Sequence, residues 1–177
     1  AERFDTQVIF DHIESTDLSS KPYKLFGNSA NYTCDALIIT TGASAQYLGL
    51  PSEEAFMGRG VSACATCDGF FYRGKDVAVV GGGDTATEEA MYLAGLCKKV
   101  YLIVRRDELR ASKVMAERTI KTKNIEILWK HQTKGLFGDG VVEGAELYKN
   151  KGEGNEEIVK IKIDGFFLAI GHKPNSD

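Results

Sequence analysis

A run of glycines between an apolar segment and a helix-forming segment constrains the fold of this chain more than any other feature. Six residues fit the pattern G-x-G-x-x-A, namely Gly81, Gly82, Gly83, Asp84, Thr85 and Ala86. The first glycine allows a tight turn, the second glycine of the pattern lets the backbone approach a pyrophosphate, and the alanine allows close helix–strand packing. The motif predicts a dinucleotide-binding turn at a helix N-terminus. The alternative is a glycine-rich turn in which Asp84 or Thr85 only caps the helix.

The segments around this turn alternate between strand and helix patterns. Five of them predict, in order, strand, helix, strand, helix and strand: residues 76–81, 84–96, 99–104, 111–121 and 125–129. This order is the mononucleotide-binding half of a doubly wound α/β fold, with a three-layer, Rossmann-like arrangement. Two alternating segments, around 141–148 and 157–163, then predict the antiparallel hairpin of a β-meander, and 166–170 predicts a closing strand.

The beginning of the chain resembles its end. Residues 7–12 predict a strand, and Asp35–Ala43 repeats the pattern of Asp164–His172, in which an aspartate precedes an apolar run and a glycine. We therefore expect residues 1–44 to be the back half of a preceding dinucleotide-binding domain. The alternative is that the chain contains two unrelated β-meanders.

Composition excludes several classes of protein. Charged residues make up 27% of the chain and the formal net charge is −3, which gives no footprint of nucleic-acid binding. The longest apolar runs, such as Ala36–Ile39, are too short to span a bilayer. No basic-then-apolar leader opens the chain, and four cysteines are too few for a disulfide scaffold. We expect a cytoplasmic protein that binds neither nucleic acid nor membrane.

A close pair of cysteines, Cys64 and Cys67, is followed directly by Asp68. A C-x-x-C turn can bring two sulfurs into disulfide distance and commonly lowers the pKa of one thiol to about 7. Zinc would need two further ligands, but Cys34, Cys97 and the three histidines are scattered, so no metal site is expected. A redox pair is therefore favoured over a zinc site or a purely structural turn. Cys34 and Cys97 are interpreted as buried, inert thiols.

Three arginines follow the second predicted strand of the α/β unit. An NAD site usually has Asp or Glu at the end of that strand, whereas this strand ends in Val104 and is followed by Arg105, Arg106 and Arg110. Arginine side chains suit a doubly charged phosphate, so the pattern favours NADPH. The alternative is a solvated cluster in which neighbouring acidic residues neutralise the arginines.

The order and spacing of four motifs resemble those of bacterial low-molecular-weight thioredoxin reductases over essentially the whole chain. The motifs are Gly58–Phe71 around the cysteine pair, the glycine turn, the arginine cluster, and Ala169–Asn175, in which Ile170 and Gly171 are candidate cofactor-binding residues. The family often has His at the position of Val104. That difference removes one possible phosphate partner and leaves the three arginines.

The resemblance implies a fragment of a homodimeric FAD enzyme that passes electrons from NADPH through flavin to a Cys64–Cys67 disulfide and on to thioredoxin, with Asp68 as the acid/base. It implies that residues 1–44 are the back half of a truncated FAD-binding domain, that 45–172 form the NADPH-binding domain, and that 173–177 start the return crossing. We expect this chain alone to hold little or no FAD and to be inactive. Two alternatives are the flavoprotein subunit of a peroxiredoxin-reducing system and a non-catalytic NADP-binding module.

Overall fold

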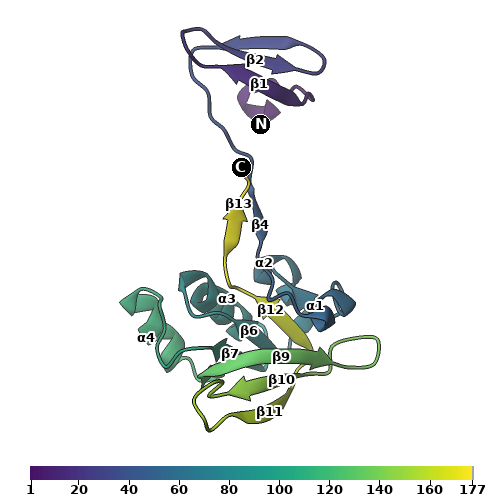
Figure 1. Ribbon diagram of the computed structural model, residues 1–177, viewed down its shortest axis with the longest axis vertical. Helices are drawn as coiled ribbons and strands as arrows, with labels where there is room; N and C mark the ends of the chain where they lie inside the picture. The colour runs from purple at the N-terminus through teal and green to yellow at the C-terminus, as the bar shows by residue number, and fades with distance from the viewer. Residues whose placement is uncertain (177) are drawn as a thin grey trace. The chain divides into compact units, whose positions relative to one another are not determined.

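The computed structural model describes residues 1–176 and divides into two compact units, residues 1–42 and residues 43–177 (Figure 1). Asp177, the end of the predicted return crossing at 173–177, lies outside the described residues. The longest helix has 11 residues, and no helix in the described part combines the length and hydrophobicity that membrane crossing requires.

The first unit is a small antiparallel meander that follows a short 3-10 turn at Glu2–Phe4. Its strands, which pair in the order β1-β2-β3, are β1 (Ile13–Asp17), β2 (Tyr23–Gly27) and β3 (Asn31–Cys34). The Asp11 carboxylate holds the turn between β2 and β3. It accepts hydrogen bonds from the backbone N–H groups of Ser29 (3.1 Å) and Ala30 (3.2 Å) and from the Tyr32 hydroxyl (2.7 Å).

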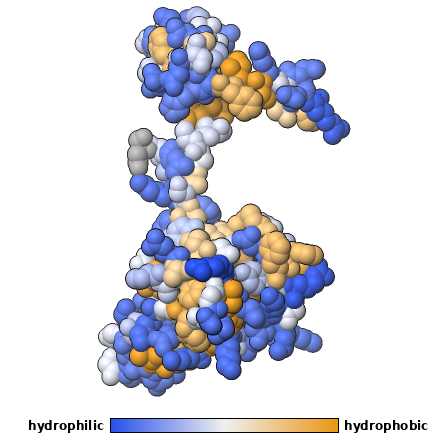
Figure 2. All heavy atoms as spheres, turned by 90° about the vertical axis from the view of Figure 1, so that its right-hand side faces the viewer, coloured by the Kyte–Doolittle hydropathy of each residue, from blue (hydrophilic) through white to orange (hydrophobic). Residues whose placement is uncertain are grey.

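The strands predicted at 7–12 and 35–43 are wrong. Residues 7–12 and 35–42 have no regular structure, and β4 covers only Ala43–Ala45. A strand exists through its ladder with a neighbour, and no strand within residues 1–176 pairs with 7–12 or 35–42. Their apolar side chains are consequently exposed, with Phe10 at 95% and Ile38 at 85%, and Figure 2 shows hydrophobic spheres at the surface of this unit.

The second unit contains the predicted β-α-β-α-β arrangement. Its central sheet is parallel, with the order β5 (Val61–Ser62), β12 (Gly165–Leu168), β6 (Asp76–Val80), β7 (Lys99–Val104) and β8 (Ile125–Trp129). The connecting helices are α3 (Asp84–Ala94) and α4 (Lys113–Lys121). The doubly wound fold class is confirmed, with every predicted element of this segment present and its ends within a few residues of those expected.

Alternation along the strands sends apolar side chains to both faces of the sheet, so both faces are covered. On one face, Val77 and Val79 pack in a buried cluster with Ala86, Ala90 and Leu93 of α3. Because the helix has 3.6 residues per turn, these three positions lie on one of its faces. On the other face, a second buried cluster joins the sheet to the β-meander through Ala78, Val80, Ile103, Phe166, Leu168, Leu136, Ala145 and Leu147. The three layers are therefore helices, parallel sheet and meander.

The meander has one strand more than the sequence predicted. Its strands are β9 (His131–Phe137), β10 (Gly144–Lys149) and β11 (Glu157–Lys162), and β10 pairs antiparallel with both neighbours. The predicted hairpin between β10 and β11 is confirmed. The chain reverses from β8 into β9 at Lys130, which has a positive φ of 59°. Its amide donates to the carbonyl of Arg106 at 2.9 Å.

The remaining elements of the second unit carry the cysteine pair and the ends of the unit. They are α1 (Pro51–Ala55), α2 (Ala65–Asp68), the 3-10 turn Gly69–Tyr72, and the ribbon formed by β4 and β13 (His172–Pro174). In the ribbon, His172 is opposite Ala45 and Pro174 is opposite Ala43. The start of the predicted return crossing at 173–177 therefore pairs with the first residues of the second unit.

Candidate active site

A cavity of about 730 Å³ opens at the carboxyl ends of the parallel strands, where the glycine turn lies. This edge of an open α/β sheet is where ligands bind in doubly wound folds. The predicted cofactor-binding residues that line it are Gly81, Gly82, Gly83, Asp84, Thr85, Arg105, Arg106, Arg110, Ile170 and Gly171. Ala86 is fully buried beneath the turn, between helix and sheet.

The glycine turn leaves no room for side chains on its inner side and leaves open space on its outer side. Gly81 has a positive φ of 146°, and a Cβ there would lie 2.4 Å from the Ala169 carbonyl oxygen. A Cβ on Gly83 would meet nothing within 4 Å. Gly83 precedes α3 without a side-chain cap, so the first N–H groups of the helix remain free to bind an anion.

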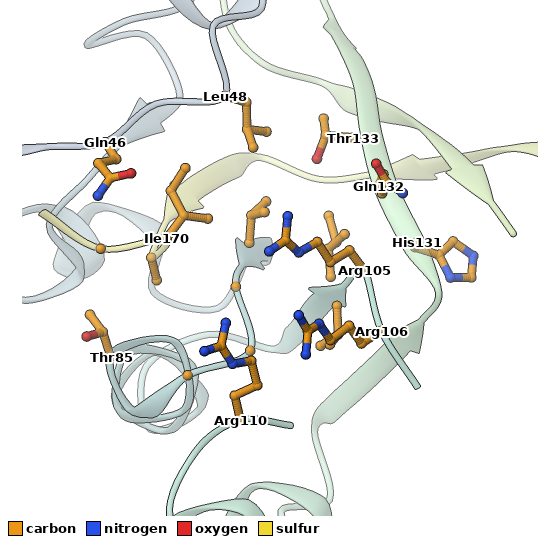
Figure 3. Close-up of a pocket in the computed structure, with 18 of the residues that line it drawn as sticks. Gln46, Leu48, Thr85, Arg105, Arg106, Arg110, His131, Gln132, Thr133 and Ile170 are labelled. Atoms are coloured by element: carbon orange, nitrogen blue, oxygen red, sulfur yellow. The ribbon is translucent and has the colours of Figure 1, made fainter. Parts of the chain in front are cut away.

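The three arginines extend from one loop toward the same cavity. Figure 3 shows the guanidinium groups of Arg105, Arg106 and Arg110 converging beside the helix start marked by Thr85. Within residues 1–176 no ion pair involves these arginines, so the neighbouring acidic residues do not neutralise them in salt bridges. Val104 is buried and contributes an apolar side chain to the lining of the cavity. The cavity thus offers unpaired cations opposite an uncapped helix N-terminus.

Several lining residues were not predicted from the sequence. Gln46 and Leu48 come from the segment after β4, His131, Gln132 and Thr133 come from β9, and Lys151 comes from the turn between β10 and β11. Figure 3 shows the His131 ring turned away from the arginines, and its Nδ1 lies 2.6 Å from the Trp129 carbonyl oxygen. Lys151 adds a fourth cationic side chain to the cavity, beside those of the three arginines. This lysine was not predicted, because the segment around it was interpreted only as the turn between two strands.

The cysteine pair forms a disulfide within α2 and the residue before it. The Cα atoms of Cys64 and Cys67 are 5.3 Å apart, and the Cys67 amide donates to the Cys64 Sγ at 3.2 Å. Cys67 is exposed and Cys64 is half-buried. Within residues 1–176, no group of three or more His, Cys, Asp or Glu side chains is placed to hold a metal ion.

Ser62 links Asp68 to the disulfide, and sequence reasoning missed it. Its hydroxyl donates to the Asp68 carboxylate at 2.6 Å and accepts from the Cys64 amide at 3.0 Å. Ser62 is buried at the end of β5, so its position is set by the edge of the parallel sheet. A serine six residues before Asp68 has no recognisable signature in the sequence, because its role depends on how the segment between the two residues folds. The arrangement fixes the predicted acid/base close to the cysteine backbone.

The cysteine pair lies apart from the cavity at the glycine turn. Cys64, Cys67 and Asp68 are absent from the lining of the large cavity, and Asp68 instead lines a second cavity of about 400 Å³ together with Ser62, Arg59 and Phe71. Phe70 and Phe71, just after α2, are 64% and 72% exposed. Exposed aromatic side chains beside a disulfide are typical of a surface that contacts another macromolecule.

The other two cysteines are free thiols. Cys97 is buried, and burial raises its pKa to about 11. Cys34 in β3 is only half-buried, in contrast to the expectation that both would be buried. The first unit is too small to cover it fully.

Comparison with known proteins places these features in a family. The family model described as pyridine nucleotide-disulphide oxidoreductase matches residues 3–177. The chain is 56% identical, over 99% of its length, to the thioredoxin reductase of Coxiella burnetii and covers 55% of that protein. It is equally identical, over the same shares of both chains, to a protein of Pseudomonas fluorescens named glucosaminate ammonia-lyase.

A solved structure gives the same picture of the fold. The thioredoxin reductase of Giardia duodenalis superposes with a TM-score of 0.81 at 36% identity, covering 99% of this chain and 57% of that one. The chain therefore spans a little over half the length of the proteins it matches.

Proposed function

The chain belongs to the pyridine nucleotide-disulphide oxidoreductase family, and we propose that it is part of an NADPH-dependent thioredoxin-disulfide reductase. Its role there is to supply the NADPH site and the redox dithiol. One observation carries the proposal: a single compact unit contains both a cation-lined dinucleotide cavity and a disulfide-bonded C-x-x-C pair. Neither feature alone would distinguish a reductase from a binding module.

The cavity fits NADPH in its chemistry. Open space at Gly83 and the free N–H groups of α3 suit the pyrophosphate, and the three unpaired arginines suit the 2′-phosphate. Ile170 lies across the cavity from the arginines (Figure 3), Gly171 also lines the cavity, and both would contact the rest of the dinucleotide. FAD, when bound, would relay the electron pair between the nicotinamide and the disulfide, which the separation of the two sites requires.

The chain's own residues carry out the thiol chemistry. Two electrons and two protons convert the Cys64–Cys67 disulfide to a dithiol. A thiolate of this pair then attacks the thioredoxin disulfide, forms a mixed disulfide and releases one thioredoxin thiolate. The second thiol resolves the mixed disulfide, which leaves reduced thioredoxin and restores Cys64–Cys67. Asp68, held by Ser62, would accept and return the thiol protons.

The proposal extends to the domains. Residues 1–44 would be the back half of an FAD-binding domain, residues 45–172 the NADPH-binding domain, and 173–177 the start of a return crossing. The compact-unit boundary at Gly42 and Ala43, and the exposed apolar segments of the first unit, support this division. Because few residues of a flavin site would then be present, we expect this chain alone to hold little or no FAD and to lack NADPH-driven activity.

The partners follow from the same assignment. The exposed Phe70 and Phe71 beside the disulfide support a protein substrate rather than a small disulfide. A homodimeric enzyme in the cytoplasm is part of the proposal, on the basis of the family. The ammonia-lyase name of one relative suggests a different reaction, but elimination of ammonia is redox-neutral and gives a C-x-x-C pair no role.

A single-turnover experiment tests the reductase assignment without flavin. The chain, reduced with dithiothreitol and then desalted, is expected to convert about one equivalent of oxidised thioredoxin to its dithiol. Cys64→Ser and Cys67→Ser should each abolish this conversion, because a lone thiol cannot resolve the mixed disulfide to regenerate Cys64–Cys67. Cys34→Ser and Cys97→Ser are matched controls and should behave as wild type. No transfer from the reduced wild type would refute the proposal and favour the NADP-binding module, whereas reduction of a peroxiredoxin-system disulfide but not of thioredoxin would favour that system.

A further inference from the structure

The loop that carries the three arginines is fastened to its surroundings at three points. The Arg106 carbonyl accepts from the Lys130 amide at 2.9 Å, and the Arg110 amide donates to the Gly82 carbonyl at 2.6 Å. The third point is the Ser112 amide, which donates to the Asp84 carboxylate at 2.8 Å. Two of these hydrogen bonds join backbone to backbone. Asp84 is therefore the side chain through which the sequence controls where the loop lies.

The charge of Asp84 is unfavourable for the ligand that the cavity suits. Asp84 is the first residue of α3 and lines the cavity beside the glycine turn, where a pyrophosphate would bind. The positive end of the helix stabilises its carboxylate, but the same carboxylate repels a phosphate. A direct contact with the dinucleotide phosphates is thus a poor explanation for an acidic side chain here, whereas its hydrogen bond to Ser112 has a clear structural effect.

We infer that Asp84 is a positioning residue, which acts by holding the loop of residues 105–112 against the glycine turn so that the arginines are preorganised for a 2′-phosphate. This inference rests on the proposed NADPH site. A loop released from Asp84 would occupy the competent position for a smaller fraction of the time, and the apparent affinity would fall by that fraction. The loss should affect NADPH and spare NADH, because both cofactors carry the pyrophosphate and only NADPH carries the 2′-phosphate.

Two substitutions at this position separate the hydrogen bond from the charge. Asp84→Asn keeps an oxygen that can accept from the Ser112 amide, whereas Asp84→Ala removes it, and both variants lose the charge. Because the charge is lost in both variants, the difference between them in the ratio of NADPH to NADH affinity isolates the hydrogen bond. Calorimetric titration of both cofactors gives that ratio, with Arg106→Ala as a reference for the loss of one phosphate contact.

We expect wild type to prefer NADPH by about a hundredfold and Arg106→Ala to reduce the ratio about tenfold. Asp84→Ala should also reduce the ratio about tenfold, and Asp84→Asn should keep it within about threefold of wild type. Asp107→Asn is the matched control, because it makes the same chemical change in the same loop at a residue that does not line the cavity. It should not lower the ratio.

Amide hydrogen exchange supplies a readout that does not depend on the ligand. Exchange at Ser112 should be faster in Asp84→Ala than in Asp84→Asn or wild type, while exchange in β6 and β7 stays unchanged and shows that the unit is folded. An unchanged ratio in Asp84→Ala, or an equal loss in both variants, would overturn the inference. A wild type that binds NADPH and NADH equally would instead refute the cofactor assignment, and exchange at Ser112 would then decide whether Asp84 holds the loop.

Discussion

The last apolar segment of the first unit and the corresponding segment of the second unit have similar sequences and different surroundings. In the first unit, Ile38 and Ile39 are 85% and 68% exposed and belong to no strand. In the second unit, Phe166 and Phe167 are fully buried in β12, which has β5 on one side and β6 on the other. The same pattern of an aspartate, an apolar run and a glycine therefore forms a strand only where neighbouring strands and covering layers are present.

The difference also shows which unit can serve as a framework for chemistry. In the second unit, helices cover one face of the sheet and the meander covers the other. The cavity and the disulfide are carried by elements that pack on this buried core. The first unit has a meander fixed by Asp11 and two apolar segments without strand partners. That asymmetry supports the proposal that residues 1–44 belong to a larger domain.

The largest expected effect is a matched pair of core substitutions. Phe167→Ala should destabilise the second unit by about 3–5 kcal/mol, because it removes a fully buried ring and leaves a cavity. Ile38→Ala should change stability by no more than about 0.5 kcal/mol, because its side chain is already in water. Urea unfolding followed by the single tryptophan, Trp129, reads the second unit, and scanning calorimetry reads both.

The same two substitutions can also contradict the contrast between the buried and the exposed apolar segments. If Ile38→Ala lowered stability by as much as a core substitution, residues 35–42 would have to be buried in solution. A small effect of Phe167→Ala would mean that the parallel sheet does not carry the stability of its unit. Tyr72→Phe is a useful control, because it keeps the edge-to-face ring contact with Phe167 and should be nearly neutral.

A second, intermediate effect concerns the free thiols, one in each unit. Cys97 is buried, and its pKa of about 11 leaves only about one thiolate in a thousand at pH 8. Cys34 is half-buried in a three-stranded meander. With Cys64–Cys67 oxidised, iodoacetamide at pH 8 should therefore modify Cys34 at least about ten times faster than Cys97. Mass mapping of the labelled peptides measures both rates, and the Cys34→Ser variant shows the rate of Cys97 alone. Equal rates would mean that the second unit opens as readily as the first.

Local patterns were enough to predict much of the second unit. The short continuous apolar runs, the helix formers with Ala86, Ala90 and Leu93 on one face, and the glycine turn predicted the parallel sheet and the edge where the cavity lies. These features depend on residues close together in the chain. They identify a strand correctly when its partners are also present.

The features that were missed depend on contacts between distant residues. Strand β9 begins after a chain reversal at Lys130, a lysine with positive φ that no sequence rule indicates. Because this strand was not predicted, the cavity residues Gln132 and Thr133 that it carries were missed as well. Ser62 gains its role from a fold that brings its hydroxyl to Asp68. The predicted strands at 7–12 and 35–43 are wrong because an apolar pattern alone does not make a strand, and no strand within residues 1–176 pairs with them.

The smallest expected effect concerns one carboxyl group in each unit, with pKa shifts of opposite direction. Burial raises the pKa of Glu89 in α3 above 4.5, although a backbone hydrogen bond from Ala65 opposes the shift. The hydroxyl of Tyr32 and the amides around Asp11 lower the pKa of Asp11 from 3.8 to about 2. The Glu89 carboxylate is therefore destabilised by desolvation in the second unit, whereas the Asp11 carboxylate is stabilised by hydrogen bonds in the first.

The two shifts predict opposite dependences of stability on pH. Above pH 4.5 the folded second unit binds more protons at Glu89 than the unfolded chain does, so its stability falls as the pH rises through that window. For Asp11 the contribution to the stability of the first unit is present above pH 3.8 and is lost as the pH falls toward 2.

Glu89→Gln should raise the melting temperature of the second unit at pH 7 by about 1–3 °C and have no such effect at pH 4. Asp11→Asn should lower the stability of the first unit at pH 7 and have no effect near pH 2. Calorimetric scans from pH 2 to 8 measure both variants, and shifts of the same sign at pH 7 would show that the two carboxyl groups are not held in opposite ways.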